Sequence, residues 1–369
     1  MKHKFKNKLD NVLLYLGIRG LLRFVSINPY CVEFRVTENC NSRCIMCNAW
    51  KNKCVNELST EEIKDALRQL KDIGIDTVIF IGGEPLLRSD IGDLIKEASL
   101  LKFPIILLVT NGLLLEEKAK ELLENGITHL TVSVDGIGSS HEIIRGIQGN
   151  FEKTIRGIKA VQKLKEDMNL NVAVTIITNM LMKQNVDMIP QLVELSRDLH
   201  VYWDFNLLDS NIDLFKGIPF SEISAEDKEK VDKTIDYITK VRRESPWLLS
   251  TCECGLKYAR RYLKGENVND YHCVHGYQIL HIRPNGEVHP CWIKEPIGNL
   301  REAKLRDIVG TKEHRDLAER IYMRDCPGCT NLCRFNIVTK HLISHKVSCE
   351  RENKKNPSVS PHLTKIETH

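Results

Sequence analysis

Short apolar runs alternate with amphipathic segments along most of the chain. Runs rich in Val, Ile and aromatic residues predict strands, and continuously apolar runs are typical of parallel strands buried on both faces. The predicted strands are 31–37, 77–81, 105–109, 130–134, 172–177 and 202–207. The amphipathic segments predict helices at 60–73, 91–101, 116–125, 151–165 and 187–198, then a long helix capped by Ser224 and Asp227.

These elements form six successive βα units, which predict an α/β fold with a parallel sheet. A closed barrel of this kind needs eight units. We therefore expect an open, partial barrel. The alternation of strands and helices would by itself fit a doubly wound sheet equally well.

The two ends of the chain differ from this repeating middle. Four lysines among the first eight residues precede an apolar stretch that Arg19 and Arg23 interrupt, which predicts a basic amphipathic helix over 9–24 rather than a signal peptide. We expect this helix to pack on the domain, with a peripheral membrane contact as the less favoured alternative. The expected parts are an N-terminal helical region 1–30, a core 31–245, a small cysteine-rich domain 246–350 and a polar, disordered tail 351–369.

Composition narrows the classes of function. The formal charge of +4 over 369 residues is mild and well mixed, so it favours neither nucleic acid nor an acidic partner. No segment reaches the uninterrupted apolar length of a transmembrane helix. The thirteen cysteines are too few for a disulfide scaffold and gather in two groups typical of metal sites, so we expect a reducing, cytoplasmic location.

The first cysteine group lies just past the predicted strand 31–37. Cys40, Cys44 and Cys47 form a C-x3-C-x2-C motif. Closed iron–sulfur clusters are ordinarily held by four thiolates, so three can hold a cluster and leave one iron open. The loop after the carboxyl end of a strand is also where α/β barrels place their chemistry. The motif therefore predicts a catalytic 4Fe-4S cluster with an open iron site.

This motif and a second one resemble the radical S-adenosylmethionine (radical SAM) superfamily. The resemblance implies a partial (βα)6 radical SAM barrel in which the three-cysteine cluster binds SAM and releases a 5′-deoxyadenosyl radical that abstracts hydrogen from a substrate. The family often has an aromatic residue where this chain has Met46, whose thioether can also pack on a ring. The second motif follows the predicted strand 77–81 and is implied to bind the SAM amino group: Gly82, Gly83, Glu84 and Pro85.

Three further loops carry weaker signals for the SAM site. Asn111 follows the third strand in an Asn-Gly dipeptide that the family often has there. Ser133 and Asp135 end the fourth strand, where they would bond ribose hydroxyls or line the substrate cavity; an ordinary Asx turn is the alternative. Arg145 resembles the arginine that reaches the SAM carboxylate, with a solvated surface arginine as the alternative.

The second cysteine group resembles the SPASM/twitch extension of radical SAM enzymes, which binds one or two auxiliary 4Fe-4S clusters. A Pro-Asn-Gly turn after position 283 predicts a hairpin that brings Cys273 back toward Cys291. The spacing inside the later group is shorter than in the full SPASM pattern, and an expected further cysteine is missing. The candidate ligands are Cys273, Cys291, Cys326, Cys329, Cys333 and Cys349.

The ligand sets remain open at this point. The last four of these cysteines would close one cluster, leaving Cys273 and Cys291 to recruit Cys252, Cys254 or a non-cysteine ligand. A single twitch-like cluster would instead use the first four. A structural zinc site is the alternative to both, because C-x2-C pairs also bind zinc. Cys31 and Cys54 are most simply buried or free thiols.

The sequence thus predicts a radical SAM oxidoreductase or maturase that oxidises a peptide or protein side chain, with a sugar or tetrapyrrole substrate as the alternative. We expect a flavodoxin- or ferredoxin-type reductant. Because the segment before Cys31 is short, a leader-bound peptide would need a separate recognition protein. Two other classes stay open: a non-catalytic iron–sulfur electron carrier, which has no use for the 82–85 motif, and a zinc-stabilised binding protein, which explains the C-terminal cysteines only.

Overall fold

The computed structural model describes residues 22, 25–52, 56–207, 227–249, 251–266, 268 and 273–325, apart from the side chains of 178–180. Most of the predicted helix 9–24, the cap Ser224 and the tail 351–369 lie outside these residues. So do five cysteines: Cys54, Cys326, Cys329, Cys333 and Cys349. None of the described helices combines the length and the apolar content that crossing a membrane requires.

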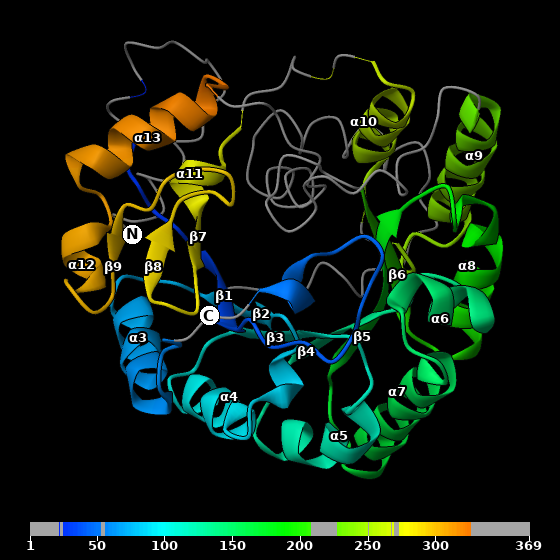
Figure 1. Cartoon of the computed structure of the whole chain (residues 1–369), viewed down its shortest axis with the longest axis horizontal. Coiled ribbons are helices and arrows are strands. Elements are labelled where there is room, and N and C mark those ends of the chain that lie inside the picture. The colour runs from blue at the N-terminus through cyan, green and yellow to red at the C-terminus, as the bar shows by residue number, and fades with distance from the viewer. Residues whose placement is uncertain are drawn as a thin grey trace.

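One curved sheet of nine strands organises the described chain, in the order β6-β5-β4-β3-β2-β1-β7-β8-β9 (Figure 1). The strands are β1 (Cys31–Thr37), β2 (Thr77–Gly82), β3 (Ile105–Thr110), β4 (His129–Ser133), β5 (Ala173–Leu181), β6 (Tyr202–Leu207), β7 (Ile279–Ile282), β8 (Glu287–His289) and β9 (Gly298–Asn299). Strands β1 to β7 pair in parallel, and β8 and β9 are antiparallel. The α/β fold with a parallel sheet is therefore confirmed. Because β1 to β6 follow chain order without the reversal of a doubly wound sheet, the partial barrel is the form adopted.

Helices surround this sheet, most of them on its outer face (Figure 1). They are α3 (Thr60–Asp72), α4 (Ile91–Leu100), α5 (Leu115–Glu124), α6 (Ser139–Arg145), α7 (Asn150–Asp167), α8 (Ile189–Asp198), α9 (Lys228–Glu244), α10 (Glu253–Leu263), α11 (His275–Gln278), α12 (Leu305–Ile308) and α13 (Lys312–Tyr322). A capping box begins α3, since Ser59 and Glu62 bond each other's backbone N–H groups. The sequence analysis missed α6, which is only seven residues long.

The core lies between the sheet and these helices. Val32, Phe34 and Val36 of β1 belong to the main apolar cluster and are at most 1% exposed. Because side chains alternate along a strand, the residues between them point to the inner face of the barrel. On β1 these are Glu33 and Arg35, both buried. The period of two therefore places polar chemistry on the concave side.

The C-terminal region continues the same sheet, because β7 pairs directly with β1. The expected division at residue 245 therefore does not interrupt the sheet, and the boundaries of the parts stay a prediction. Leu22 and Val25 pack against Val274, Tyr277 and Tyr322, so the end of the predicted N-terminal helix contacts this region.

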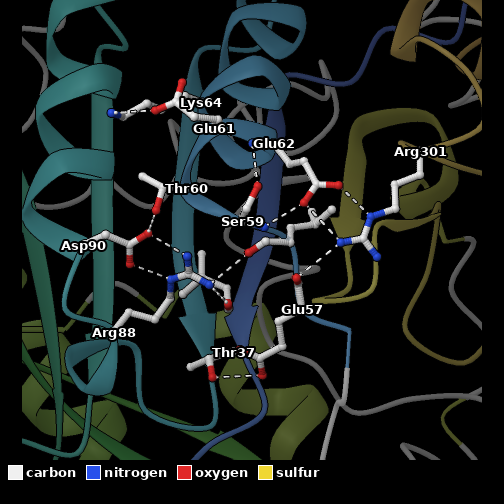
Figure 2. Close-up of polar contacts among 12 residues, drawn as sticks. Thr37, Glu57, Ser59, Thr60, Glu61, Glu62, Lys64, Arg88, Asp90 and Arg301 are labelled. Carbon is white, nitrogen blue, oxygen red and sulfur yellow. Dashed lines mark hydrogen bonds and ion pairs between the residues drawn. The ribbon is translucent and has the colours of Figure 1, made fainter.

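Arg301 fastens the C-terminal region to the core (Figure 2). Its guanidinium donates to both carboxylate oxygens of Glu62, with Nε to Oε1 at 2.6 Å and Nη2 to Oε2 at 3.1 Å. It also donates to the carbonyl oxygens of Asn56 and Glu57. These bonds, with the Ser59 cap, hold the pKa of Glu62 at about 2. The Glu57 carboxylate in turn accepts from the Thr37 hydroxyl at 3.0 Å, where the first cysteine loop begins.

We expect Arg301→Ala to lower the free energy of unfolding in urea by about 1 to 2 kcal/mol, since a bidentate, half-exposed pair exceeds an ordinary surface salt bridge. The deficit should shrink as the pH falls from about 4.5 toward 2, because Glu62 then becomes protonated in the parent as well. Lys304→Ala, which breaks the exposed pair with Asp65, should change stability by less than about 0.5 kcal/mol. Equal effects of the two substitutions would contradict the fastening role of Arg301.

Candidate iron–sulfur and cofactor site

The first three cysteines lie in one loop at the carboxyl end of β1. Cys44 is 8% exposed, and Cys40 and Cys47 are half-buried. Cys44 and Cys47 pack with Met46, Ile144 and Met182 in a small apolar cluster. Met46 is thus part of the loop's own packing. No three His, Cys, Asp or Glu among the residues the structure describes gather closely enough to hold a single metal ion.

Burial controls the protonation of these thiols. It raises the pKa of Cys40 and of Cys47 to about 11. It also raises the pKa of Cys44, although Arg145 opposes the shift. All three are therefore thiols at neutral pH until a cation compensates the thiolate charge. Three thiols in one partly buried loop are a donor set that fits an iron–sulfur cluster, because cysteines bind the cluster irons as thiolates.

Backbone contacts from the 82–85 motif hold the start of this loop. Gly83 N–H donates to the Thr37 carbonyl at 2.8 Å, and Glu84 N–H donates to the Asn39 carbonyl at 2.7 Å. A Cβ on Gly83 would stand 2.2 Å from the Asn39 oxygen, so only glycine fits. The sequence analysis assigned these glycines, through the family resemblance, to binding of the SAM amino group. In the structure, the approach that requires glycine is to the cysteine loop.

The Glu84 side chain ties β2 to the loop after β3. Its carboxylate is 1% exposed and accepts three bonds, from Leu86 N–H at 3.0 Å, the Thr110 hydroxyl at 2.7 Å and Asn111 N–H at 2.7 Å. Burial raises its pKa, and these donors oppose the shift. Pro85 begins a short 3-10 helix, η2 (Pro85–Leu87), that Glu84 caps. The carboxylate is therefore part of the scaffold around the cysteines.

Asn111 supplies a second contact to the cysteine loop. Its Nδ2 donates to Asn41 Oδ1 at 2.7 Å and lies 3.0 Å from Ser42 Oγ. Thr154 on α7 donates its hydroxyl to the Asn111 carbonyl at 3.1 Å. Asn111 is 6% exposed, so these bonds form away from bulk water. The Asn-Gly dipeptide thus bridges β3, α7 and the middle of the cysteine loop.

Arg145 forms the third contact, from the end of α6. Its carbonyl accepts from Arg43 N–H at 3.0 Å, and Gly146 follows in the left-handed conformation at a φ of 68°. The guanidinium is 4% exposed, pairs with Asp135 at 2.5 Å and reaches the Cys44 sulfur at 3.7 Å. Burial lowers the pKa of Arg145, but Asp135 and Cys44 outweigh it and raise the pKa overall. The alternative of a solvated surface arginine is therefore wrong.

Ser133 and Asp135 lie on the same rim. Ser133 is the last residue of β4 and is 2% exposed. The Asp135 side chain is fully buried, and its backbone N–H donates to His141 Nδ1 at 3.1 Å. The pairing of Asp135 with Arg145 was not visible in the sequence, because ten positions separate them and an unrecognised helix, α6, brings them together.

The second cysteine group is only partly described. The hairpin of β7 and β8 returns the chain as predicted, and Cys273 and Cys291 pack in one cluster with Leu317 and Ile321. Both cysteines are 9% exposed. Cys326, Cys329, Cys333 and Cys349 lie outside the described residues, so the ligand sets stay a prediction.

A buried polar network on the inner face escaped the sequence analysis. Glu33 on β1 accepts from Trp292 Nε1 at 2.7 Å and pairs with His281 Nδ1 on β7 at 3.1 Å. His281 Nε2 lies 2.6 Å from His275 Nε2. Burial raises the pKa of Glu33, but His281, His275 and Trp292 together outweigh it and the pKa is lowered overall. The register of the parallel pair β1 and β7, which sets Glu33 opposite His281, brings these residues together. The one sequence signal for the network was Glu33 itself, a charged residue inside an apolar strand.

Comparison with known proteins places the chain among related enzymes. The model of the radical SAM superfamily matches residues 34–196, and that of the SPASM iron–sulfur cluster-binding domain matches 273–330. An AdoMet-dependent heme synthase from Methanosarcina barkeri is 27% identical over 76% of this chain and 82% of its own length. The PqqA peptide cyclase of Bradyrhizobium diazoefficiens is 25% identical over 75% of this chain and 70% of its own.

Solved structures share the fold. SuiB from Streptococcus suis, bound to S-adenosylmethionine, has a TM-score of 0.63 at 19% identity, covering 79% of this chain and 68% of that one. The enzyme anSMEcpe with bound AdoMet and a peptide has a TM-score of 0.61 at 15% identity, covering 89% and 100%. At these identities the likeness concerns the fold alone.

We expect Glu84→Ala to lower the free energy of unfolding by about 2 to 4 kcal/mol, because it strands three buried donors at once. Urea titration of the protein without added cofactor would measure it. Glu302→Ala, an exposed carboxylate, should stay within about 0.5 kcal/mol of the parent. A Glu84→Ala protein as stable as the Glu302 control would show that the carboxylate does not hold the two loops together.

Proposed function

The chain belongs to the radical SAM superfamily and carries a SPASM iron–sulfur domain, and from this premise we propose that it oxidises its substrate by hydrogen abstraction. The observation that supports the proposal is the cysteine loop, which Gly83, Asn111 and Arg145 hold by hydrogen bonds. The enzyme uses a 4Fe-4S cluster, SAM and auxiliary iron–sulfur clusters. Cys40, Cys44 and Cys47 would hold the catalytic cluster. When this cluster and SAM are both bound, together they supply a 5′-deoxyadenosyl radical.

The surrounding residues prepare this site. Arg145 brings a fixed positive charge beside Cys44, which favours the thiolate that iron requires. Asp135 holds that arginine in place and balances its charge within the protein. The side chains of Glu84 and Asn111 are engaged with neighbouring loops. We therefore propose that SAM contacts the backbone of Gly82 to Pro85, which these side chains hold in place. We propose Ser133 and Asp135 as the residues at the ribose side of the same rim.

For the substrate we propose a peptide or protein side chain, which the PqqA peptide cyclase relative supports. A tetrapyrrole is the second candidate, favoured by the longer and more similar alignment with the heme synthase. In either case net oxidation requires an electron acceptor, and the cluster at Cys273 and Cys291 suits that role. The cysteine usage supports a cytoplasmic location.

We further propose where the reductant docks. Trp50 is exposed beside the cysteine loop, with the Arg43 guanidinium 6.0 Å and the Lys51 ammonium 5.2 Å from its ring centroid. An exposed aromatic residue flanked by two cations suits an acidic protein surface, such as that of a flavodoxin- or ferredoxin-type donor. Docking there would place the donor three residues from Cys47 in the chain.

The catalytic assignment predicts that replacing Cys40, Cys44 and Cys47 together by Ala abolishes formation of 5′-deoxyadenosine. The assay is chromatography after anaerobic reconstitution with dithionite and SAM. Some iron should remain at the C-terminal cysteines. Cys31→Ser, which changes a buried thiol at the start of β1, should keep the activity. Undiminished cleavage by the triple variant would overturn the assignment.

The docking assignment predicts that Lys51→Glu slows flavodoxin-driven SAM cleavage roughly threefold to tenfold at low salt, since reversing a rim charge mainly slows encounter. Dithionite needs no docking, so the rate with dithionite should not change. Lys163→Glu, on the exposed side of α7, is the matched control. A loss shared by both reductants, or by the Lys163 variant, would remove this surface from consideration.

A further inference from the structure

Cys252 and Cys254 form a thiol pair outside both assigned cysteine groups. Their sulfurs lie 2.8 Å apart at the start of α10. The Cys252 sulfur caps this helix by accepting from Gly255 N–H at 3.4 Å. Cys252 is 7% exposed, whereas Cys254 is half-buried and therefore more accessible. The sequence analysis named them only as alternative ligands for a cluster at Cys273 and Cys291, and both lie outside the matched family models.

The separation of the two sulfurs discriminates between kinds of site. A disulfide bond is about 2.05 Å long. Two thiolates on one tetrahedral zinc ion would be about 3.8 Å apart, as Zn–S bonds of about 2.3 Å require. Thiolates on different irons of a cluster stand further apart still. The observed 2.8 Å is nearer to the length of a disulfide bond than to the separation of two ligands on one zinc ion, and a small movement would let the sulfurs react with each other.

The surroundings activate the pair. The hydrogen bond from Cys254 is the largest cause that lowers the pKa of Cys252 to about 7, with help from Gly255 N–H and the charge of Arg242. Arg242 is fixed by donating to the carbonyls of Pro246 and Leu249. Thiolates at a helix N-terminus beside an arginine are the reactive kind. Either sulfur can donate the hydrogen bond between them, so the two thiols titrate as a pair.

The fold places the segment that leads to the pair beside β6, at the other end of the strand order from β7 and β8. Leu249 bridges Trp203 of β6 in parallel, and the Thr251 hydroxyl donates to Asp204 at 2.7 Å. The chain therefore runs beside β6 toward the carboxyl ends of the strands, where the cysteine loop also lies. Strands β7 and β8, which lead from Cys273 to Cys291, are separated from β6 by β1 to β5 in the sheet (Figure 1).

We propose that Cys252 and Cys254 form a redox-active dithiol–disulfide couple that exchanges with a thiol–disulfide partner. The thiolate of the accessible Cys254 attacks one sulfur of the partner disulfide and expels the other as a thiolate, leaving a mixed disulfide on Cys254. The thiolate of Cys252 then attacks the Cys254 sulfur and expels the second partner thiolate. Two protein thiols are thereby oxidised and one partner disulfide is reduced to two thiols, with the two protons of the protein thiols ending on the two expelled partner sulfurs.

The test uses the anaerobically reconstituted holoenzyme, with oxidised glutathione as the probe and iodoacetamide to block the remaining thiols. The tryptic peptide 244–257 contains these two cysteines and no other. We expect most of it to appear unalkylated and two hydrogens lighter than the reduced peptide. Dithiothreitol added before blocking should restore double alkylation. Two independently alkylated cysteines at every glutathione ratio would overturn the proposal.

Single substitutions separate the couple from a metal site. Cys252→Ser should stop at a stable glutathione adduct on Cys254, whereas Cys254→Ser should give at least tenfold less adduct, because Cys252 is buried. Iron and sulfide should match the parent in both variants. Loss of about four iron and four sulfide atoms in either one would make these residues cluster ligands instead and overturn the proposal. The peptide measurement on the parent decides the matter even if a variant fails to fold.

Discussion

The cysteine loop owes its shape to hydrogen bonds from three separate parts of the barrel, by backbone groups of Gly83, Glu84 and Arg145 and by the side chain of Asn111. Gly83 and Glu84 hold its start, Asn111 its middle and Arg145 its end. A loop that must present three sulfurs to one cluster cannot rely on local turn preferences, because its conformational freedom is large. Contacts from the barrel rim restrict that freedom. The conformation of the cysteine loop therefore depends on the pairing of β1, β2 and β3 and on the position of α6.

Buried charge is the second constraint on the rim. Arg145 and Asp135 neutralise each other at 2.5 Å with almost no exposure, and Glu84 is surrounded by three donors. Breaking such a buried arrangement by removing one partner is costly, because the remaining charge or donor stays away from water. The same low polarity raises the pKa of the Cys40 and Cys47 thiols when no cluster is bound. Binding of a cluster would compensate the thiolate charges, so it would stabilise the folded rim.

The C-terminal region is joined to the catalytic loop through structure rather than through a flexible linker. Pairing of β7 with β1 sets Glu33 beside His281, and Arg301 grips the segment whose Glu57 carboxylate bonds Thr37. The proposed transfer of an electron to an auxiliary cluster requires a fixed distance from the substrate. A shared sheet and an ion-paired fastening on the core provide that rigidity.

The sequence by itself determined the strands and the fold class and predicted the principal cysteines, because these depend on local periodicity and on spacing within one loop. The run 31–37 is apolar enough to form β1, and the spacing of the cysteines from Cys40 to Cys47 predicts an iron–sulfur cluster. Only the tertiary structure decided that Asp135 pairs with Arg145, that Gly83 touches the cysteine loop and that Glu33 meets His281. Such contacts join positions up to hundreds of residues apart, and the energy that selects them comes from packing and burial, which no local pattern encodes.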